Sequence, residues 1–127
     1  MSWQGYVDTS LLATGKIDKA AIFSAAGDSV WAASPNFAVK PEEVQALIKA
    51  YTDSAPLYEK GLYISGNKNV CIKADDRSIY GRQGKEGVCC VKTKQAILVA
   101  HYPETVQPGE AAKVVEQLAD YLIGVGY

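Results

Sequence analysis

The residue types that could carry out acid–base chemistry are few in this sequence, and their spacing matches no catalytic arrangement. The single histidine, His101, ends an apolar run beside Tyr102, and no predicted serine or cysteine nucleophile is placed to use it. Asp75 and Asp76 are adjacent carboxylates, but Arg77 follows them on a predicted turn, which indicates loop residues. We therefore interpret His101 as a structural residue of a sheet and expect no enzymatic activity.

The cysteines, Cys71, Cys89 and Cys90, are the remaining reactive groups. Their number is odd, and the adjacent pair would point to opposite faces of a strand. No cluster of histidine and cysteine accompanies them, so we interpret them as reduced thiols that fill apolar space, and we expect neither a metal nor another cofactor. A small cytosolic redox protein or enzyme that uses His101 or the Cys89–Cys90 pair is kept as an alternative. It would require a turnover that is lost when these residues are substituted.

The segment Gly81–Gly87 contains glycines at three-residue intervals, as phosphate-binding loops do. Here the segment joins two predicted strands and opens no helix, whereas a phosphate-binding loop needs a helix N-terminus to hold the anion. We expect a flexible hairpin loop that carries Arg82 and Lys85.

Aromatic residues gather at both ends of the sequence. Trp3 and Tyr6 lie one helical turn apart, and Tyr121 and Tyr127 lie near the other end. If the terminal helices pack side by side, these rings meet, with Trp31 from the sheet below them. Such a cluster suits a polyproline II ligand, because this helix is ordered before binding and its carbonyls accept hydrogen bonds from Trp and Tyr. The alternative is that Trp3 and Tyr6 are ordinary core residues that cover a sheet edge.

The sequence predicts helices at both ends of the chain and short strands between them. Ser2 can cap a first helix from Trp3 to about Leu12, and Pro108 opens a last helix that Gly124 can stop. Pro41 opens a further helix, which closes at residues 53–56, and the predicted strands are 19–23, 29–33, 61–64, 70–73, 78–80, 88–91 and 96–102. The links between the later strands are too short for crossover helices, so we expect an antiparallel sheet and an α+β fold.

Composition limits the function classes. The chain has 127 residues, 48% of them hydrophobic, and a net charge of −1, which fits one domain over residues 1–127 and argues against binding to nucleic acid. No apolar run is long enough to span a membrane, and the first residues lack the pattern of a signal peptide. We expect a cytosolic protein that is not transmembrane and that is a monomer.

Several motifs, in a specific order and spacing, connect these elements: residues 2–8, 27–32, 75–81, 93–95, 101–103, 108–111 and 118–122. The first reads Ser-Trp-Gln-Gly-Tyr-Val-Asp. Together they cover essentially the whole chain, and they resemble the profilins, in particular the short profilins of fungal type. The resemblance implies a central antiparallel sheet with the terminal helices on one face and smaller helices on the other.

The resemblance also implies a poly-proline groove between the terminal helices. The matching residues are Trp3, Tyr6, Trp31, Tyr121, Leu122 and Tyr127. Tyr121 stands where longer profilins often carry a histidine, and it keeps an aromatic hydrogen-bond donor there.

A second face, formed by the later strands and the C-terminal helix, is implied to bind monomeric actin. The matching residues are Lys73, Arg77, Arg82, Lys85, Val106, Lys113 and Gln117. Because actin is acidic, basic side chains around an apolar contact would speed and orient association. The alternative is a poly-proline peptide-binding module without actin activity, in which the basic residues only solvate the surface.

Profilins regulate actin polymerisation, deliver actin to proline-rich proteins such as formins, and bind phosphatidylinositol bisphosphate through basic patches. They also promote nucleotide exchange on actin, which is an effect on the partner's conformational equilibrium. The resemblance therefore implies these partners for this chain, and a location in the cytoplasm, the actin cytoskeleton and the cell cortex. The sequence does not determine which basic residues bind the lipid.

Overall fold

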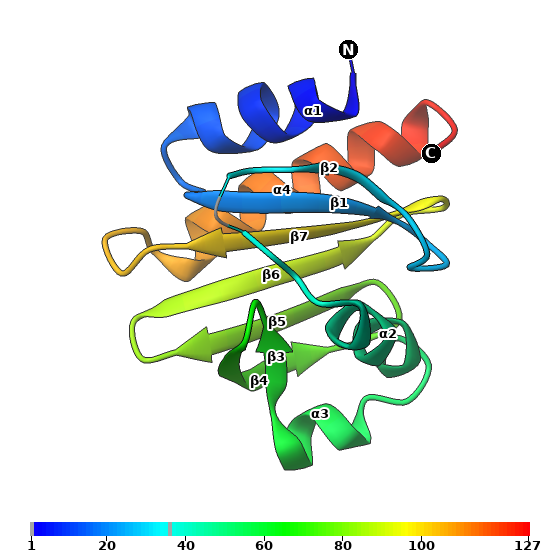
Figure 1. Ribbon diagram of the computed structural model, residues 1–127. Helices are drawn as coiled ribbons and strands as arrows, with labels where there is room; N and C mark the ends of the chain where they lie inside the picture. Colours follow the sequence, from blue (N-terminus) through cyan, green and yellow to red (C-terminus); the bar gives the residue numbers. More distant parts are fainter. Residues whose placement is uncertain (1, 36) are drawn as a thin grey trace.

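The computed structural model describes residues 2–35 and 37–127, which form an antiparallel sheet between two layers of helices (Figure 1). Within these residues the sheet has seven strands in the order β2-β1-β7-β6-β5-β4-β3. All neighbouring strands are antiparallel. The strands are β1 (Lys19–Ser24), β2 (Val30–Ala33), β3 (Leu62–Ile64), β4 (Asn67–Ala74), β5 (Ser78–Gln83), β6 (Glu86–Lys92) and β7 (Ala96–Tyr102). The predicted α+β fold with an antiparallel sheet is confirmed.

The two terminal helical segments lie side by side on one face of the sheet (Figure 1). The first begins as α1 (Trp3–Gly5), continues as the π-helical turn η1 (Tyr6–Leu11) and ends as the 3₁₀ turn η2 (Leu12–Thr14). The Ser2 hydroxyl accepts a hydrogen bond from the Gly5 N–H and so caps the start. Gly15, with a φ of +77°, ends the segment, and α4 (Pro108–Gly124) is the C-terminal helix.

Apolar side chains fill both faces of the sheet. On the face of the terminal helices, Val7, Val115 and Leu122 pack with Leu98 of β7, and all four are fully buried. On the other face, the smaller helices α2 (Pro41–Ala50) and α3 (Ala55–Lys60) cover a second core. Because side chains alternate along a strand, β7 contributes Leu98 to the first core and Ile97 to the second. The predicted distribution of helices over the two faces is confirmed.

The helix α3 is absent from the sequence-based expectation, which closes the preceding segment at residues 53–56. Pro56 stands at the second position of α3, where its missing N–H costs no intrahelical hydrogen bond. Leu57 is 5% exposed and anchors the helix to the second core. Such a short helix depends on this tertiary contact, which local pattern does not show.

Two turns are tighter than the sequence suggests. The segment expected as a glycine-rich loop is mostly strand, since β5 extends to Gln83, β6 begins at Glu86, and only Gly84 and Lys85 form the turn. The turn between β3 and β4 is formed by Ser65 and Gly66, both with positive φ, instead of residues 66–69. The buried carboxylate of Glu43 accepts the N–H groups of both turn residues at 2.8 Å, so α2 determines where this turn falls.

Candidate functional site

Aromatic side chains from both ends of the chain form one continuous surface, which we call the aromatic ledge; it consists of Trp3, Tyr6, Trp31, Tyr121 and Tyr127. The centroid of the Trp3 ring lies 4.6 Å from that of Trp31 and 5.1 Å from that of Tyr127. The Tyr6 centroid lies 5.6 Å from Trp3 and 6.1 Å from Tyr121. The structure thus brings together the rings that the sequence places more than a hundred residues apart.

Two sets of hydrogen bonds hold the ends of the chain in place. The Gln4 side chain pairs with β2, because its amide donates to the Ala33 carbonyl at 3.0 Å and its oxygen accepts from the Ala33 N–H at 3.4 Å. This contact places Trp3 over Trp31. The main-chain oxygen of Tyr127 accepts from the Gln95 N–H and from the Thr93 hydroxyl, at 2.6 and 2.7 Å. The turn between β6 and β7 therefore fixes the C-terminal tyrosine beside Trp3.

The ledge offers both apolar surface and hydrogen-bond donors. Tyr121 and Tyr127 are 54% and 42% exposed, and Trp3, Tyr6 and Trp31 are partly exposed. Loss of solvent around the Tyr6 hydroxyl and its contact with Tyr121 raise the pKa of Tyr6, so it stays a protonated donor at neutral pH. Tilted rings with partly exposed surfaces and hydroxyl groups suit a ligand that has rigid apolar rings and free carbonyls.

Leu122 does not belong to the exposed site. It is 0% exposed and packs in the first core, so it cannot contact a ligand on the ledge directly. The reason lies in helical geometry, because Tyr121 and Leu122 are consecutive on α4 and point about 100° apart. Leu122 supports the ledge from below through the packing of α4.

A second surface lies on the face of the sheet that carries the terminal helices, beyond the part that α4 covers. We call it the sheet patch and define it as Val70, Ile72, Lys73, Tyr80 and Arg82. Val70 and Ile72 on β4 are 65% and 56% exposed, which is unusual for apolar strand residues. The register pairs Val70 with Arg82 and Lys73 with Tyr80 across β4 and β5. Ile72, Tyr80, Arg82 and neighbouring residues line a hollow of about 130 Å³, so the patch combines an apolar depression with cations.

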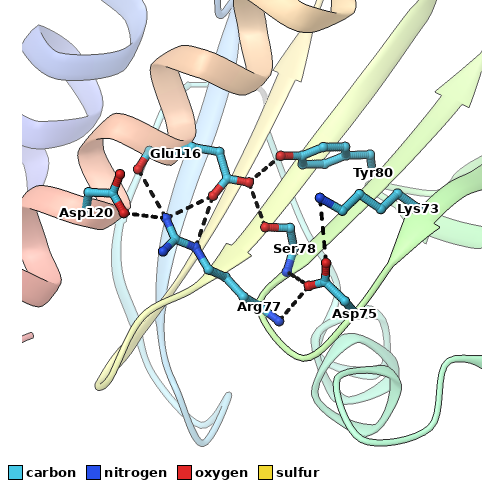
Figure 2. A network of polar contacts seen from close by, with 7 residues as sticks. All are labelled: Lys73, Asp75, Arg77, Ser78, Tyr80, Glu116 and Asp120. Atoms are coloured by element: carbon cyan, nitrogen blue, oxygen red, sulfur yellow. Dashed lines mark hydrogen bonds and ion pairs between the residues drawn. The ribbon is translucent and has the colours of Figure 1, made fainter.

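A network of polar contacts joins the sheet patch to α4 (Figure 2). The Glu116 carboxylate accepts hydrogen bonds from Arg77 Nε at 3.1 Å, from the Ser78 hydroxyl at 2.6 Å and from the Tyr80 hydroxyl. Arg77 also pairs with Asp120 at 2.8 Å. Burial and the Glu116 carboxylate together raise the pKa of Tyr80 well above its ordinary value. Arg77 is therefore held by two carboxylates of this chain.

The other residues matched to an actin-binding face differ in their surroundings. Within residues 2–35 and 37–127, the exposed side chains of Arg82, Lys85 and Lys113 have no ion pair. Val106 is 8% exposed and packs in the first core, so it supports the surface from below. Gln117 faces the space between η1 and α4, beside Tyr6, and not the sheet patch.

His101 and the cysteines have structural environments. His101 Nδ1 lies 2.6 Å from Asp18 and its Nε2 lies 3.4 Å from Glu86, so both ring nitrogens have partners. Burial raises the pKa of the Cys89 thiol to about 12 and that of Cys90 well above its usual value, which leaves no reactive thiolate at neutral pH. In the described part of the chain, no group of His, Cys, Asp or Glu could hold a metal ion, and no helix could cross a membrane.

Sequence reasoning missed three residues of these surfaces. The sequence predicts a strand that contains Val70 and Ile72, but it does not show that no helix covers the face of β4 on which they lie. Their signal was weak, because Cys71 between them is also apolar and the run shows no polar alternation. Glu116 was missed because its partners lie about forty residues away in the sequence. Only the position of α4 over the sheet brings them together, because the Glu116 side chain reaches β5 from there.

Comparison with known proteins gives a consistent result over the full length. The family model for profilin matches residues 1–127. Profilins of Schizosaccharomyces pombe and Saccharomyces cerevisiae are 60% and 56% identical over 127 residues, which is all of this chain and all of each relative. The solved structure of the S. pombe profilin superposes with a TM-score of 0.96 and covers 99% of this chain and 100% of its own. A structure of mouse profilin IIa, 24% identical, has a TM-score of 0.84 with full coverage of both chains.

The chain belongs to the profilin family. Members of this family are non-enzymatic actin-binding proteins that regulate actin and associate with the cytoskeleton. Membership of this family argues against the redox or enzymatic alternative. It also argues against a peptide-binding module without actin activity, because profilins regulate actin.

Proposed function

We propose that this chain, as one domain spanning residues 1–127, binds proline-rich ligands on the aromatic ledge and monomeric actin on the sheet patch. The observation that carries the first assignment is the close packing of Trp3 with Trp31, Tyr6 and Tyr127, all of them partly exposed. Proline rings fit between such side chains, and the indole and phenol groups donate to the ligand's carbonyls. The ligand loses little conformational entropy on binding, which favours binding to a small surface.

The mouse relative supports this assignment. Its structure is a complex with a double repeat from the FH1 domain of mDia1, and it shares the fold of this chain. We propose that formin-type proline-rich segments bind this chain at the corresponding place, between the terminal helices.

For actin, the proposed contact combines the exposed apolar residues Val70 and Ile72 with surrounding cations. Arg82, Lys85 and Lys113 have no ion pairs in the described parts of the chain, so they are free to meet carboxylates of an acidic partner. We assign Arg77 a different task from the one inferred by matching, because Glu116 and Asp120 already hold it. Arg77 fixes α4 to the edge of the sheet patch, and the other cations attract the acidic partner.

Substitution of Trp3 and Lys113 tests the separation of the two surfaces. Trp3→Ala removes the central ring of the ledge, and we expect retention on poly-L-proline resin to be lost while actin affinity is unchanged. Lys113→Glu reverses a charge on α4 one helical turn before Glu116, which contacts Tyr80 of the sheet patch. We expect actin affinity to fall about five- to tenfold with poly-proline binding unchanged. A folded Trp3→Ala protein that lost both activities would contradict the separation of the two surfaces. Unchanged actin affinity of Lys113→Glu would contradict the assignment of the actin-binding surface.

We further propose that the same exposed cations bind phosphatidylinositol bisphosphate and bring the protein to the cell cortex. Each lysine or arginine near an anionic membrane contributes about 1 kcal/mol of attraction, so three such residues favour weak, salt-sensitive binding. Because the lipid and actin would use overlapping residues, they should compete. Sedimentation with vesicles that contain the lipid, with and without actin monomer, tests this; simultaneous binding at full strength would contradict it.

A further inference from the structure

The turn between β6 and β7 lies close to Tyr127, the C-terminal residue of the aromatic ledge (Figure 1). Two residues of this turn, Thr93 and Gln95, make the contacts, and we call them the turn brace. Besides the hydrogen bonds from the Gln95 N–H and the Thr93 hydroxyl to the main-chain oxygen of Tyr127, the Gln95 side-chain amide donates to the Gly126 carbonyl at 2.9 Å. The turn brace therefore holds two consecutive residues of the C-terminal segment, although it contributes no ring to the ledge.

The Thr93 hydroxyl is directed specifically at Tyr127. Thr93 is 5% exposed, and its hydroxyl oxygen accepts the Ala96 N–H at 3.0 Å. The same oxygen lies 2.7 Å from the main-chain oxygen of Tyr127 and 3.3 Å from the Ala96 carbonyl. Because a hydroxyl has only one proton to donate, the shorter contact takes it. The buried hydroxyl thus serves both the turn and the C-terminal tyrosine.

Gln95 also connects this turn to the hairpin that carries Trp31. Its carbonyl accepts the N–H of Ala25, which lies in the turn between β1 and β2, at 2.9 Å. The strand β2 is in turn bound by the side chain of Gln4, the residue after Trp3. Hydrogen bonds therefore run from the C-terminal tyrosine through Gln95 to the hairpin of Trp31, and from β2 to the first helical segment.

The end of α4 directs the chain toward the turn brace. The Tyr127 N–H donates to the Leu122 carbonyl at 2.8 Å and the Gly126 N–H donates to the Ile123 carbonyl at 3.2 Å, a pattern that commonly ends helices. Gly126 has a φ of +97°, which a residue with a side chain rarely adopts. The Tyr127 side chain is 42% exposed, so packing alone holds it weakly. Its edge-on position against Trp3 depends on how its main chain is held.

We propose that Thr93 and Gln95 are positioning residues of the aromatic ledge, which act on the ligand only through Tyr127. The inference rests on the proposed binding of proline-rich ligands to the ledge. With the turn brace in place, the ring of Tyr127 stands against Trp3 before a ligand arrives. Without it, the C-terminal residues have to be ordered when the ligand binds, and this ordering lowers the affinity. The turn between β6 and β7 therefore contributes to affinity without touching the ligand.

Calorimetric titration with an eight-proline peptide tests this dependence. Thr93→Val removes the hydroxyl and keeps the shape of the side chain, and we expect the affinity to fall about three- to tenfold, the usual cost of ordering one side chain on binding. Thr93→Ser keeps the hydroxyl and should bind within about twofold of the wild type. Gln95→Ala removes only the amide contact with Gly126, so it is the second variant if Thr93→Val does not fold; we expect a loss of about threefold.

Two further measurements distinguish positioning from a general loss of stability. The indole N–H signal of Trp3 should shift in Thr93→Val before any peptide is added, because the Tyr127 ring no longer stands edge-on to it. In a Tyr127→Ala background, Thr93→Val should cause no further loss of affinity, since the ring through which it acts is gone. Thr52→Val is the matched control, because it removes a hydroxyl that donates to the Lys49 carbonyl on the opposite face of the sheet, and it should leave proline affinity unchanged.

The outcomes separate this inference from the proposed function. If the wild type binds the peptide and Thr93→Val binds it equally well, the inference is wrong and the ledge assignment stands. Additive losses in the Tyr127→Ala background would also overturn it, because Thr93 would then act by another route. An equal loss in Thr52→Val would overturn it too, since the effect would follow stability alone. If the wild-type protein does not bind the peptide, the proposed function fails and the inference fails with it.

Discussion

Replacing Glu116 with alanine removes the centre of the network that joins α4 to β5 (Figure 2). The carboxylate accepts hydrogen bonds from Ser78, Tyr80 and Arg77. Ser78 is 3% exposed and Tyr80 is partly buried, so their hydroxyl groups lose a partner that water cannot fully replace. Arg77 is more exposed and keeps its pairing with Asp120.

The size of the effect follows from these contacts. A buried donor left without a partner costs about 1–3 kcal/mol, and two such hydroxyl groups are affected, one of them only partly buried. The exposed side of Arg77 is screened by solvent, and its lost pairing adds less than about 1 kcal/mol. We therefore expect Glu116→Ala to lower the free energy of unfolding by about 2–4 kcal/mol. For a domain of this size that corresponds to a fall in Tm of roughly 10 °C.

Urea unfolding followed by tryptophan fluorescence measures this directly, with scanning calorimetry as a second probe. Glu59→Ala is a matched control, because Glu59 is exposed on α3 and has no ion pair within residues 2–35 and 37–127. It should change stability by less than about 0.5 kcal/mol. If Glu116→Ala were no more destabilising than this control, the network would not stabilise the fold and our interpretation of Arg77 would lose its basis.

Two further predictions concern the strands. The N–H groups of Ser78 and Arg77 donate to the Asp75 carboxylate and lower its pKa. The ionised carboxylate therefore stabilises the fold fully above its unfolded pKa near 4, and this stabilisation disappears as pH falls through the lower folded pKa. In urea unfolding, Asp75→Asn should lose less stability than the wild type between about pH 5 and pH 3; the same loss in both proteins would contradict this. A Cβ on Gly87 would lie 2.3 Å from the Tyr102 hydroxyl and 2.5 Å from a backbone oxygen, so Gly87→Ala should lower the free energy of unfolding by about 1–3 kcal/mol. Gly109→Ala is the control, because a Cβ there meets open space and should be tolerated. Equal Tm values for the two variants would refute the close approach at Gly87.

Local pattern in the sequence predicts the parts of the fold that local chemistry determines. Ser2 caps the first helical segment and Pro108 opens α4, as their residue types indicate. The α3 helix could not be predicted, because it is short and depends on the burial of Leu57. The position of the turn at Ser65 could not be predicted either, since it is set by hydrogen bonds to Glu43, which lies more than twenty residues earlier.

The same distinction holds for the binding surfaces. The spacing of Trp3 and Tyr6 on one helical face is readable from the sequence, and their meeting with Tyr127 follows once the terminal helices are placed together. Burial of Leu122 is a consequence of its neighbour facing outward on α4, which matching by position does not reveal. The pairing of Arg77 with α4 depends on tertiary contacts across about forty residues, so its basic character alone does not show that two carboxylates of this chain hold it.

The most direct test of where proline-rich ligands bind is a map of amide and indole NMR shifts during titration with an eight-proline peptide. If the aromatic ledge is the site, the indole N–H signals of Trp3 and Trp31 and the amide of Tyr127 shift with a common Kd, while the amides of Val70 and Ile72 do not move. Shifts confined to Val70 and Ile72, with both indole signals unchanged, would show that the ledge is not the binding surface.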